Sequence, residues 1–213
     1  MVFMTLRERK RLRTRQAILT AATDLFERHG YTETTLDDIA AAAEISKRAI
    51  FSYFASKEDL LFPESDARIG AAIGAIAARQ PGDGPVQVLL RAMTTSAQES
   101  DDLTGRRAAL RLRLMRTVPA VRGRALQHQF DAQREIARHL AAVFPADLSP
   151  ISAAALTGAF IGAVTGVLDL FFEEQEPPQD PVELRATLLR VTQMALTPWL
   201  DTSSGERDLS SDI

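Results

Sequence analysis

The chain has 213 residues, a formal net charge of −3 and no cysteine, and 46% of its residues are hydrophobic. This length suits one large domain or two small ones, and the lack of cysteine excludes disulfides, zinc–thiolate sites and cysteine nucleophiles. The most apolar stretch, Ile151–Phe172, contains Ser152, Thr165 and Asp169, which favours a buried helix of a soluble protein over a membrane span. The composition therefore predicts a cytoplasmic protein without membrane contact.

Charge is unevenly distributed along the chain. Residues 1–16 carry six Lys and Arg against one acidic residue, and residues 103–139 carry nine against two. Residues 140–213 carry three against eleven. The overall acidic balance therefore does not exclude a polyanionic partner, because the basic charge is local.

Helical periodicity dominates the sequence, and strand and hairpin signals are nearly absent. We expect an all-α fold of about nine helices. The first helix ends at Gly30. The other eight cover, in chain order, about 36–43, 47–53, 57–79, 85–100, 104–117, 119–144, 150–175 and 181–199.

Two short helices separated by a turn carry the clearest functional signal. Thr35 and Asp38 form a capping-box pattern, and Ser46 is a second N-cap that places Lys47 and Arg48 in the first turn of the following helix. Cations there oppose the helix dipole, at a cost of roughly 0.3–1 kcal/mol. They become favourable where the helix meets an anion, as the second helix of a helix-turn-helix does in the major groove.

The segment AILTAATDLFERHGYTETTLDDIAAAAEISKRAIFSYFASKEDLL resembles the DNA-binding domain of the TetR family of bacterial regulators, over about residues 14–61. The resemblance implies nine or ten helices, of which the first three bind DNA and the others bind an effector and dimerise. We accordingly expect a DNA-binding domain at 1–62, an effector-binding and dimerisation domain at 63–200, and a flexible tail at 201–213.

The resemblance also implies roles for individual residues. Those at phosphate-contacting positions are Thr34 or Thr35, Tyr53 and Lys57, and those at base-facing or near-base positions are Lys47, Arg48, Ala49 and Ser52. Ser46 and Phe51 complete the expected DNA-binding set. Two residues depart from the family pattern: Glu44 stands in the turn where Gly is usual, and Phe51 replaces a Tyr that commonly contacts phosphate.

The arginine-rich segment 106–124 has two interpretations. It is either a solvated or ion-paired surface, or the cationic mouth of a site for an anionic effector such as an acyl-CoA. The segment also resembles the effector domain of TetR-type regulators that bind acyl-CoA-like ligands. The candidate ligand-binding residues are Arg106, Arg107, Leu110, Arg111, Leu114 and Phe160, of which the apolar ones equally fit an ordinary core.

Gly158, Gly162 and Gly166 recur at every fourth position, which allows a second helix to approach closely. Together with Leu184 and Leu188 they suit the four-helix dimer interface that the family resemblance implies. The alternative is burial within a single chain.

Catalysis has little support in the sequence. His29, His128 and His139 are scattered, and no nucleophile motif, phosphate-binding loop or metal-ligand cluster accompanies them. We therefore expect no catalytic residues, no metal and no cofactor. The predicted function is a homodimeric regulator that binds double-stranded operator DNA and a small-molecule effector, as a repressor released by that effector. A TetR-like activator, an all-α enzyme and a structural adaptor are the alternatives.

Overall fold

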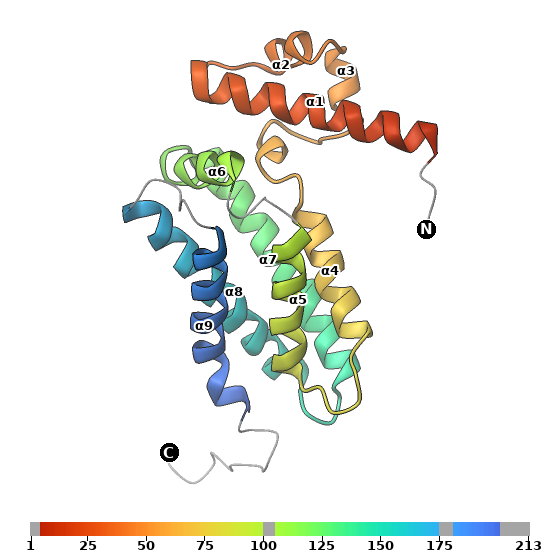
Figure 1. Cartoon of the computed structure of the whole chain (residues 1–213), viewed down its shortest axis with the longest axis vertical. Helices are drawn as coiled ribbons and strands as arrows, with labels where there is room; N and C mark the ends of the chain where they lie inside the picture. The colour runs from red at the N-terminus through yellow and green to blue at the C-terminus, as the bar shows by residue number, and fades with distance from the viewer. Residues whose placement is uncertain (1–4, 100–104, 175–180, 201–213) are drawn as a thin grey trace. The chain divides into compact units, whose positions relative to one another are not determined.

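The computed structural model describes residues 5–99, 105–174 and 181–200 (Figure 1). All regular structure in these ranges is helical, so the predicted all-α class is confirmed. The elements are α1 (Leu6–His29), α2 (Leu36–Ala42), α3 (Lys47–Ile50), the 3-10 helix η1 (Glu58–Leu61), α4 (Ser65–Ala77), α5 (Pro85–Glu99), α6 (Arg106–Thr117), α7 (Pro119–Val143), α8 (Pro150–Glu174) and α9 (Pro181–Leu200). The tail expected at 201–213 lies outside the described residues.

The chain divides into two compact units. The first consists of the described residues up to Pro63 together with Leu110–Arg124, and the second contains Glu64–Ala109 and the described residues from Ala125 onward. The division therefore passes through α6 and α7, both of which the sequence analysis assigned to the C-terminal domain. We call these the first unit and the second unit.

The first unit has an apolar core to which α1, α2 and α3 contribute, and Figure 1 shows α2 and α3 above the long red helix α1. Its members include Ile18, Leu19 and Phe26 of α1, Ile39 of α2 and Ile50 of α3, each at most 2% exposed. Their helical spacing brings one face of each element inward. This packing leaves the opposite face of α3 in solvent.

The structure corrects the helix expected at 57–79. η1 ends at Leu61, and α4 begins only at Ser65. Pro63 explains the break, because a proline disfavours the α conformation of the residue before it and has no N–H to donate. Phe62 accordingly has φ −123° and ψ 44°. The segment expected to form one helix therefore consists of two helices separated by a break.

The second unit is built around one apolar cluster to which α4, α5, α7, α8 and α9 contribute. Ile76, Leu89, Leu140, Leu156 and Leu196 represent the five helices in it, and each has no exposed surface. In Figure 1, α8 and α9 run side by side, and α5 packs against both α4 and α9. The five helices therefore share one hydrophobic core.

Helix α8 is unusually apolar and unusually exposed. Its segment Pro150–Leu170 is long and apolar enough to cross a membrane by length and composition, with a mean hydropathy of 1.9. We expected a buried helix, but only 22% of this window is buried within the chain. Burial in the core of one protomer therefore does not explain why the exposed residues of this helix are so apolar.

Candidate functional site

The start of α2 is fixed by the predicted capping box. The backbone N–H of Asp38 donates to the Thr35 hydroxyl at 3.2 Å, and the backbone N–H of Thr35 donates to the Asp38 carboxylate at 2.8 Å. The hydrogen bonds from the Thr35 side chain and backbone lower the pKa of Asp38. This reciprocal cap sets the direction of α2 and, through the turn that follows, that of α3.

The turn between α2 and α3 is backbone-strained at the position where the family usually has glycine. Glu44 has φ 55°, the single non-glycine residue with positive φ in the described ranges. A side chain in this left-handed conformation is disfavoured sterically. After the turn, the Ser46 hydroxyl accepts from the Ala49 N–H at 3.2 Å, which confirms the predicted N-cap of α3.

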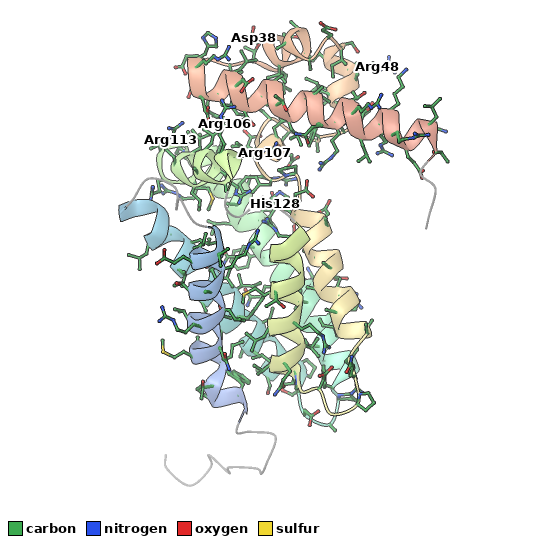
Figure 2. The ribbon with its side chains drawn as sticks, viewed as in Figure 1. Asp38, Arg48, Arg106, Arg107, Arg113 and His128 are labelled. Atoms are coloured by element: carbon green, nitrogen blue, oxygen red, sulfur yellow. The ribbon has the colours of Figure 1, made fainter. Side chains whose placement is uncertain are left out.

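α3 is shorter than expected, and its outer face is polar. Regular helix ends at Ile50 instead of residue 53, because the following N–H groups of Ser52 and Tyr53 bond three residues back. Lys47, Arg48 and Ser52 are exposed, and Figure 2 shows Arg48 projecting from this helix into solvent. The predicted base-facing residues therefore share one accessible surface, with Ala49 half-buried and Ser46 exposed at its edge.

Phe51 belongs to the same surface. Its side chain is 51% exposed, so it is not required by the core of the first unit. A phenyl ring has no hydrogen to donate to phosphate, but it suits apolar contact with a thymine methyl.

An ion pair joins α3 back to α2. The Lys47 Nζ lies 2.7 Å from Asp37 Oδ2, with 50% and 66% of the two side chains exposed. The sequence analysis did not identify Asp37 as part of the site. The sequence shows Asp37 only as an acidic residue near the start of a helix. Its pairing with Lys47 depends on the geometry of the turn between α2 and α3.

Two residues predicted to contact phosphate instead donate hydrogen bonds to backbone carbonyls within the protein. Thr34 is 3% exposed and its hydroxyl donates to the carbonyl of Gly30 at 2.7 Å, so it supports the end of α1 and is not open to DNA. Lys57 donates to the carbonyl of Tyr31 and lies 4.1 Å above the Tyr31 ring. Burial lowers the pKa of Lys57. Thr35, by contrast, is exposed.

Basic residues of α1 flank the remaining phosphate candidate. Tyr53 is half-buried, and the Arg11 guanidinium carbon lies 6.0 Å from its ring centroid. Arg15 lies over Phe54 at 5.2 Å and also donates to the carbonyl of Pro63. The basic N-terminal segment is therefore helical from Leu6 and adjoins α3, which the sequence showed only as a charged run.

The first unit is completed by residues of α6 and α7. Arg124 donates through Nε to Asp59 Oδ1 at 2.6 Å, and Asp59 has only 12% of its side chain exposed. Arg111 is 6% exposed and donates to the carbonyl of Leu61 at 3.3 Å. Two arginines of the segment 106–124 thus contact η1, and one of them, Arg111, is an expected ligand-binding residue.

The expected ligand-binding residues are therefore divided between the two units. Leu110, Arg111 and Leu114 belong to the first unit and are buried there, whereas Arg106, Arg107 and Phe160 belong to the second. Arg111 in particular serves the first unit through its bond to Leu61. Figure 2 labels Arg106 and Arg107, which form the first turn of α6.

The expected dimer residues also separate into two groups. Leu184 and Leu188 are at most 3% exposed within the protomer, and a side chain at Gly158 would meet Gln133 of α7. Gly162 and Gly166, however, are exposed and have open space beyond them. Within the described residues, no group of three His, Cys, Asp or Glu side chains could hold a metal ion.

Comparison with known proteins defines the class of protein. Residues 18–62 match the model of "Bacterial regulatory proteins, tetR family", and residues 83–196, more than half of the chain, match the "MftR C-terminal domain". The fold is a helix-turn-helix domain followed by an all-helical domain. The chain belongs to the TetR family of bacterial transcriptional regulators, which are DNA-binding proteins and not enzymes.

Its relatives include the HTH-type transcriptional regulator TcmR of Streptomyces glaucescens, 33% identical over 149 residues that cover 67% of this chain and 66% of that one. The HTH-type transcriptional regulator AcrR of Shigella flexneri is 39% identical over 79 residues, which cover 36% of each chain. The chain therefore spans about two thirds or less of the length of the curated relatives it matches.

Solved structures agree with this fold. FadR of Thermus thermophilus, a TetR-family repressor in complex with lauroyl-CoA, superposes with a TM-score of 0.54 at 19% identity, covering 90% of this chain and 96% of that one. A transcriptional regulator from Aquifex aeolicus gives a TM-score of 0.51 at 20% identity, covering 85% and 98%. At these identities the likeness concerns the fold alone.

Proposed function

We propose that the protein is a ligand-responsive transcriptional repressor that binds double-stranded operator DNA through α3. The observation that carries this proposal is the outer face of α3, where Lys47 and Arg48 are exposed on a helix capped by Ser46 and anchored by Ile50. Membership of a family of DNA-binding regulators supports it. Such a protein acts in the cytoplasm, where its operator lies.

The direct test is a gel-shift titration with DNA from upstream of the gene. Lys47→Ala/Arg48→Ala should weaken binding roughly 10- to 100-fold, because a base contact by a bidentate side chain is worth about 1–3 kcal/mol. Arg134→Ala/Arg138→Ala on α7 removes the same charge from exposed positions of the second unit and should leave binding nearly unchanged. Normal operator affinity in the α3 variant would exclude α3 as the reading element.

The same proposal includes a homodimer formed through α8. Ile151, Gly162, Gly166 and Leu170 lie on one exposed stripe of this helix, with Ile151 82% and Leu170 58% exposed. The two glycines leave room for a partner helix. A partner on this stripe explains why so apolar a helix is so little buried.

Gly162→Leu should therefore obstruct dimerisation. Gly70→Leu is the matched control, because Gly70 is also an exposed helical glycine with open space beyond it but lies on α4. Light scattering should find the wild type and Gly70→Leu as dimers and Gly162→Leu as a monomer. A monomeric wild type at micromolar concentration would contradict this part of the proposal.

For the effector we propose an amphipathic anion of the acyl-CoA type, bound by the second unit. The residues that support it are Arg106, Arg107 and Phe160, together with Thr192 of α9, whose fully buried hydroxyl has no hydrogen-bond partner among the described residues. Three other buried threonines, Thr23, Thr34 and Thr157, all donate to backbone carbonyls. Thr192 thus offers a polar contact inside an apolar interior.

Calorimetry and gel shift with lauroyl-CoA, coenzyme A and lauric acid separate the parts of this idea. Lauroyl-CoA should bind and lower operator affinity, and Arg106→Ala/Arg107→Ala should weaken that binding because it removes two phosphate-binding cations. A ligand changes the DNA-binding equilibrium only if it prefers one of the two states. If lauroyl-CoA neither binds nor affects operator affinity, the arginines form a solvated or ion-paired surface.

A further inference from the structure

The proposed function uses Lys47 but leaves its ion-pair partner Asp37 without a role. The family pattern supplies a role for Lys47 but none for the carboxylate 2.7 Å from its ammonium group. The pair bridges the first turn of α2 and the first turn of α3, on the side of the unit that carries Arg48. Any DNA that meets Lys47 therefore also meets the charge of Asp37.

We propose that Asp37 is a specificity-determining residue, which suppresses contacts of Lys47 with phosphate while leaving it able to reach a base edge. The proposal rests on the use of α3 to read DNA. Its physical basis is that phosphate contacts and base contacts depend differently on charge and on direction.

Contacts with phosphate depend mainly on charge. They supply most of the affinity for non-specific DNA, through release of the counterions condensed on the duplex. A carboxylate within hydrogen-bond distance cancels much of the field of the ammonium group beyond the pair. Lys47 thus contributes less than a full unit charge to binding at random sequences.

Contacts with a base edge depend on direction as well. The lysine ammonium has three N–H donors, and the bond to Asp37 uses one of them. The others remain available for guanine O6 or N7 in the major groove. Asp37 also restricts the long lysine side chain to one region of the surface, so that less conformational entropy is lost when the base contact forms.

The exposure of the pair keeps this restraint weak. Half of the Lys47 side chain and two thirds of the Asp37 side chain are in solvent. Exposed pairs of this kind contribute little to stability. Replacing Asp37 should therefore change DNA binding without unfolding the first unit, and Asp38, which makes the capping box, is left intact.

The test compares Asp37→Asn with the wild type on two duplexes of equal length, one selected from a random pool by the wild-type protein and one with that sequence shuffled. On the shuffled duplex, Asp37→Asn should raise affinity roughly five- to tenfold at about 0.1 M salt and steepen the salt dependence by about 0.9 for each bound α3. On the selected duplex the increase should be smaller, so that the ratio of specific to non-specific affinity falls.

Two variants control for trivial explanations. Asp147→Asn removes the same charge from an exposed position in the second unit and should change the affinity for neither duplex. In a Lys47→Ala background, Asp37→Asn should raise affinity equally on both duplexes, because without the lysine the carboxylate only repels phosphate. Equal increases on both duplexes in the wild-type background, or a difference between the duplexes that persists without Lys47, would overturn the proposal.

A further variant separates this inference from the function on which it rests. Arg48→Ala should weaken binding to the selected duplex whatever the role of Asp37. If it has no effect, α3 does not read DNA and both proposals fail. If Arg48→Ala weakens binding while Asp37→Asn changes nothing, only the role of Asp37 is refuted.

Discussion

The contacts that stabilise the first unit differ in kind from those that stabilise the second. Both units bury a comparable set of apolar side chains. In the first unit this core is accompanied by directed polar contacts: a capping box at Thr35, an ion pair at Asp59 and cations over the rings of Tyr31 and Phe54. In the second unit, one apolar cluster is shared by five helices.

In the second unit, we expect substitutions in the shared apolar cluster to have the largest effect on stability. Leu140→Ala on α7, at a side chain with no exposed surface, should destabilise the protein by about 2–5 kcal/mol, because it leaves a cavity in the apolar cluster. Leu126→Ala on the same helix, 47% exposed, should cost far less. Denaturant unfolding of both variants measures the contrast, and equal losses would mean that the cluster is not the stabilising core.

In the first unit, the ion pair of Arg124 should be the most sensitive polar contact. Arg124→Ala removes the partner of a carboxylate that is only 12% exposed, and we expect a loss of about 2 kcal/mol, reduced from the fully buried case by partial solvation. Arg134→Ala, at an exposed position of α7, is the control for helix and charge. Thermal unfolding should resolve the two, and identical midpoints would refute a stabilising role for the pair.

The cap of α2 should have a smaller effect. Thr35→Ala removes the N-cap hydroxyl and should cost about 1 kcal/mol. Because the hydrogen bonds from Thr35 lower the pKa of Asp38, this contribution is fully present above the ordinary carboxyl pKa and is lost as the pH falls below it, through the lowered pKa of the folded protein. The stability difference between wild type and variant should shrink on acidification, and a difference independent of pH would argue against the reciprocal cap.

The strained turn should give the smallest change, and in the opposite direction. Glu44→Gly relieves a side chain held at φ 55° and should stabilise the protein by up to about 1 kcal/mol, after the greater chain entropy of glycine is subtracted. Glu44→Gln removes the charge but keeps the conformation, so it should leave stability nearly unchanged. If both raise the unfolding midpoint equally, repulsion and not backbone strain is responsible.

The sequence was most informative where structure and function depend on neighbours in the chain. The cap residues Thr35 and Ser46 and the exposed cations that follow them lie within a few positions of each other, so their geometry follows from helix rules alone. The family resemblance then supplied the helix-turn-helix and its partner domain. The break before α4 also follows from a local signal, because Pro63 disfavours helix at Phe62.

Contacts between distant segments were not predictable in this way. Arg124 and Asp59 are 65 positions apart, and Arg111 and Leu61 are 50 apart, so only the packed chain brings them together. The seven arginines of segment 106–124 could not be assigned separate roles, because a sequence reports composition and not direction. In the structure, Arg111 and Arg124 support η1, and Arg106 and Arg107 lie at the start of α6.

The position of the division between the units has a consequence for exchanging domains between regulators. A junction placed at Pro63, the natural choice from the linear sequence, would transfer Asp59 and Leu61 to the hybrid without Arg124 and Arg111. The donor segment would then face foreign residues at both positions. A hybrid that also grafts Leu110–Arg124 keeps these contacts, so transplantable modules in this protein are defined by packing and not by a single cut in the chain.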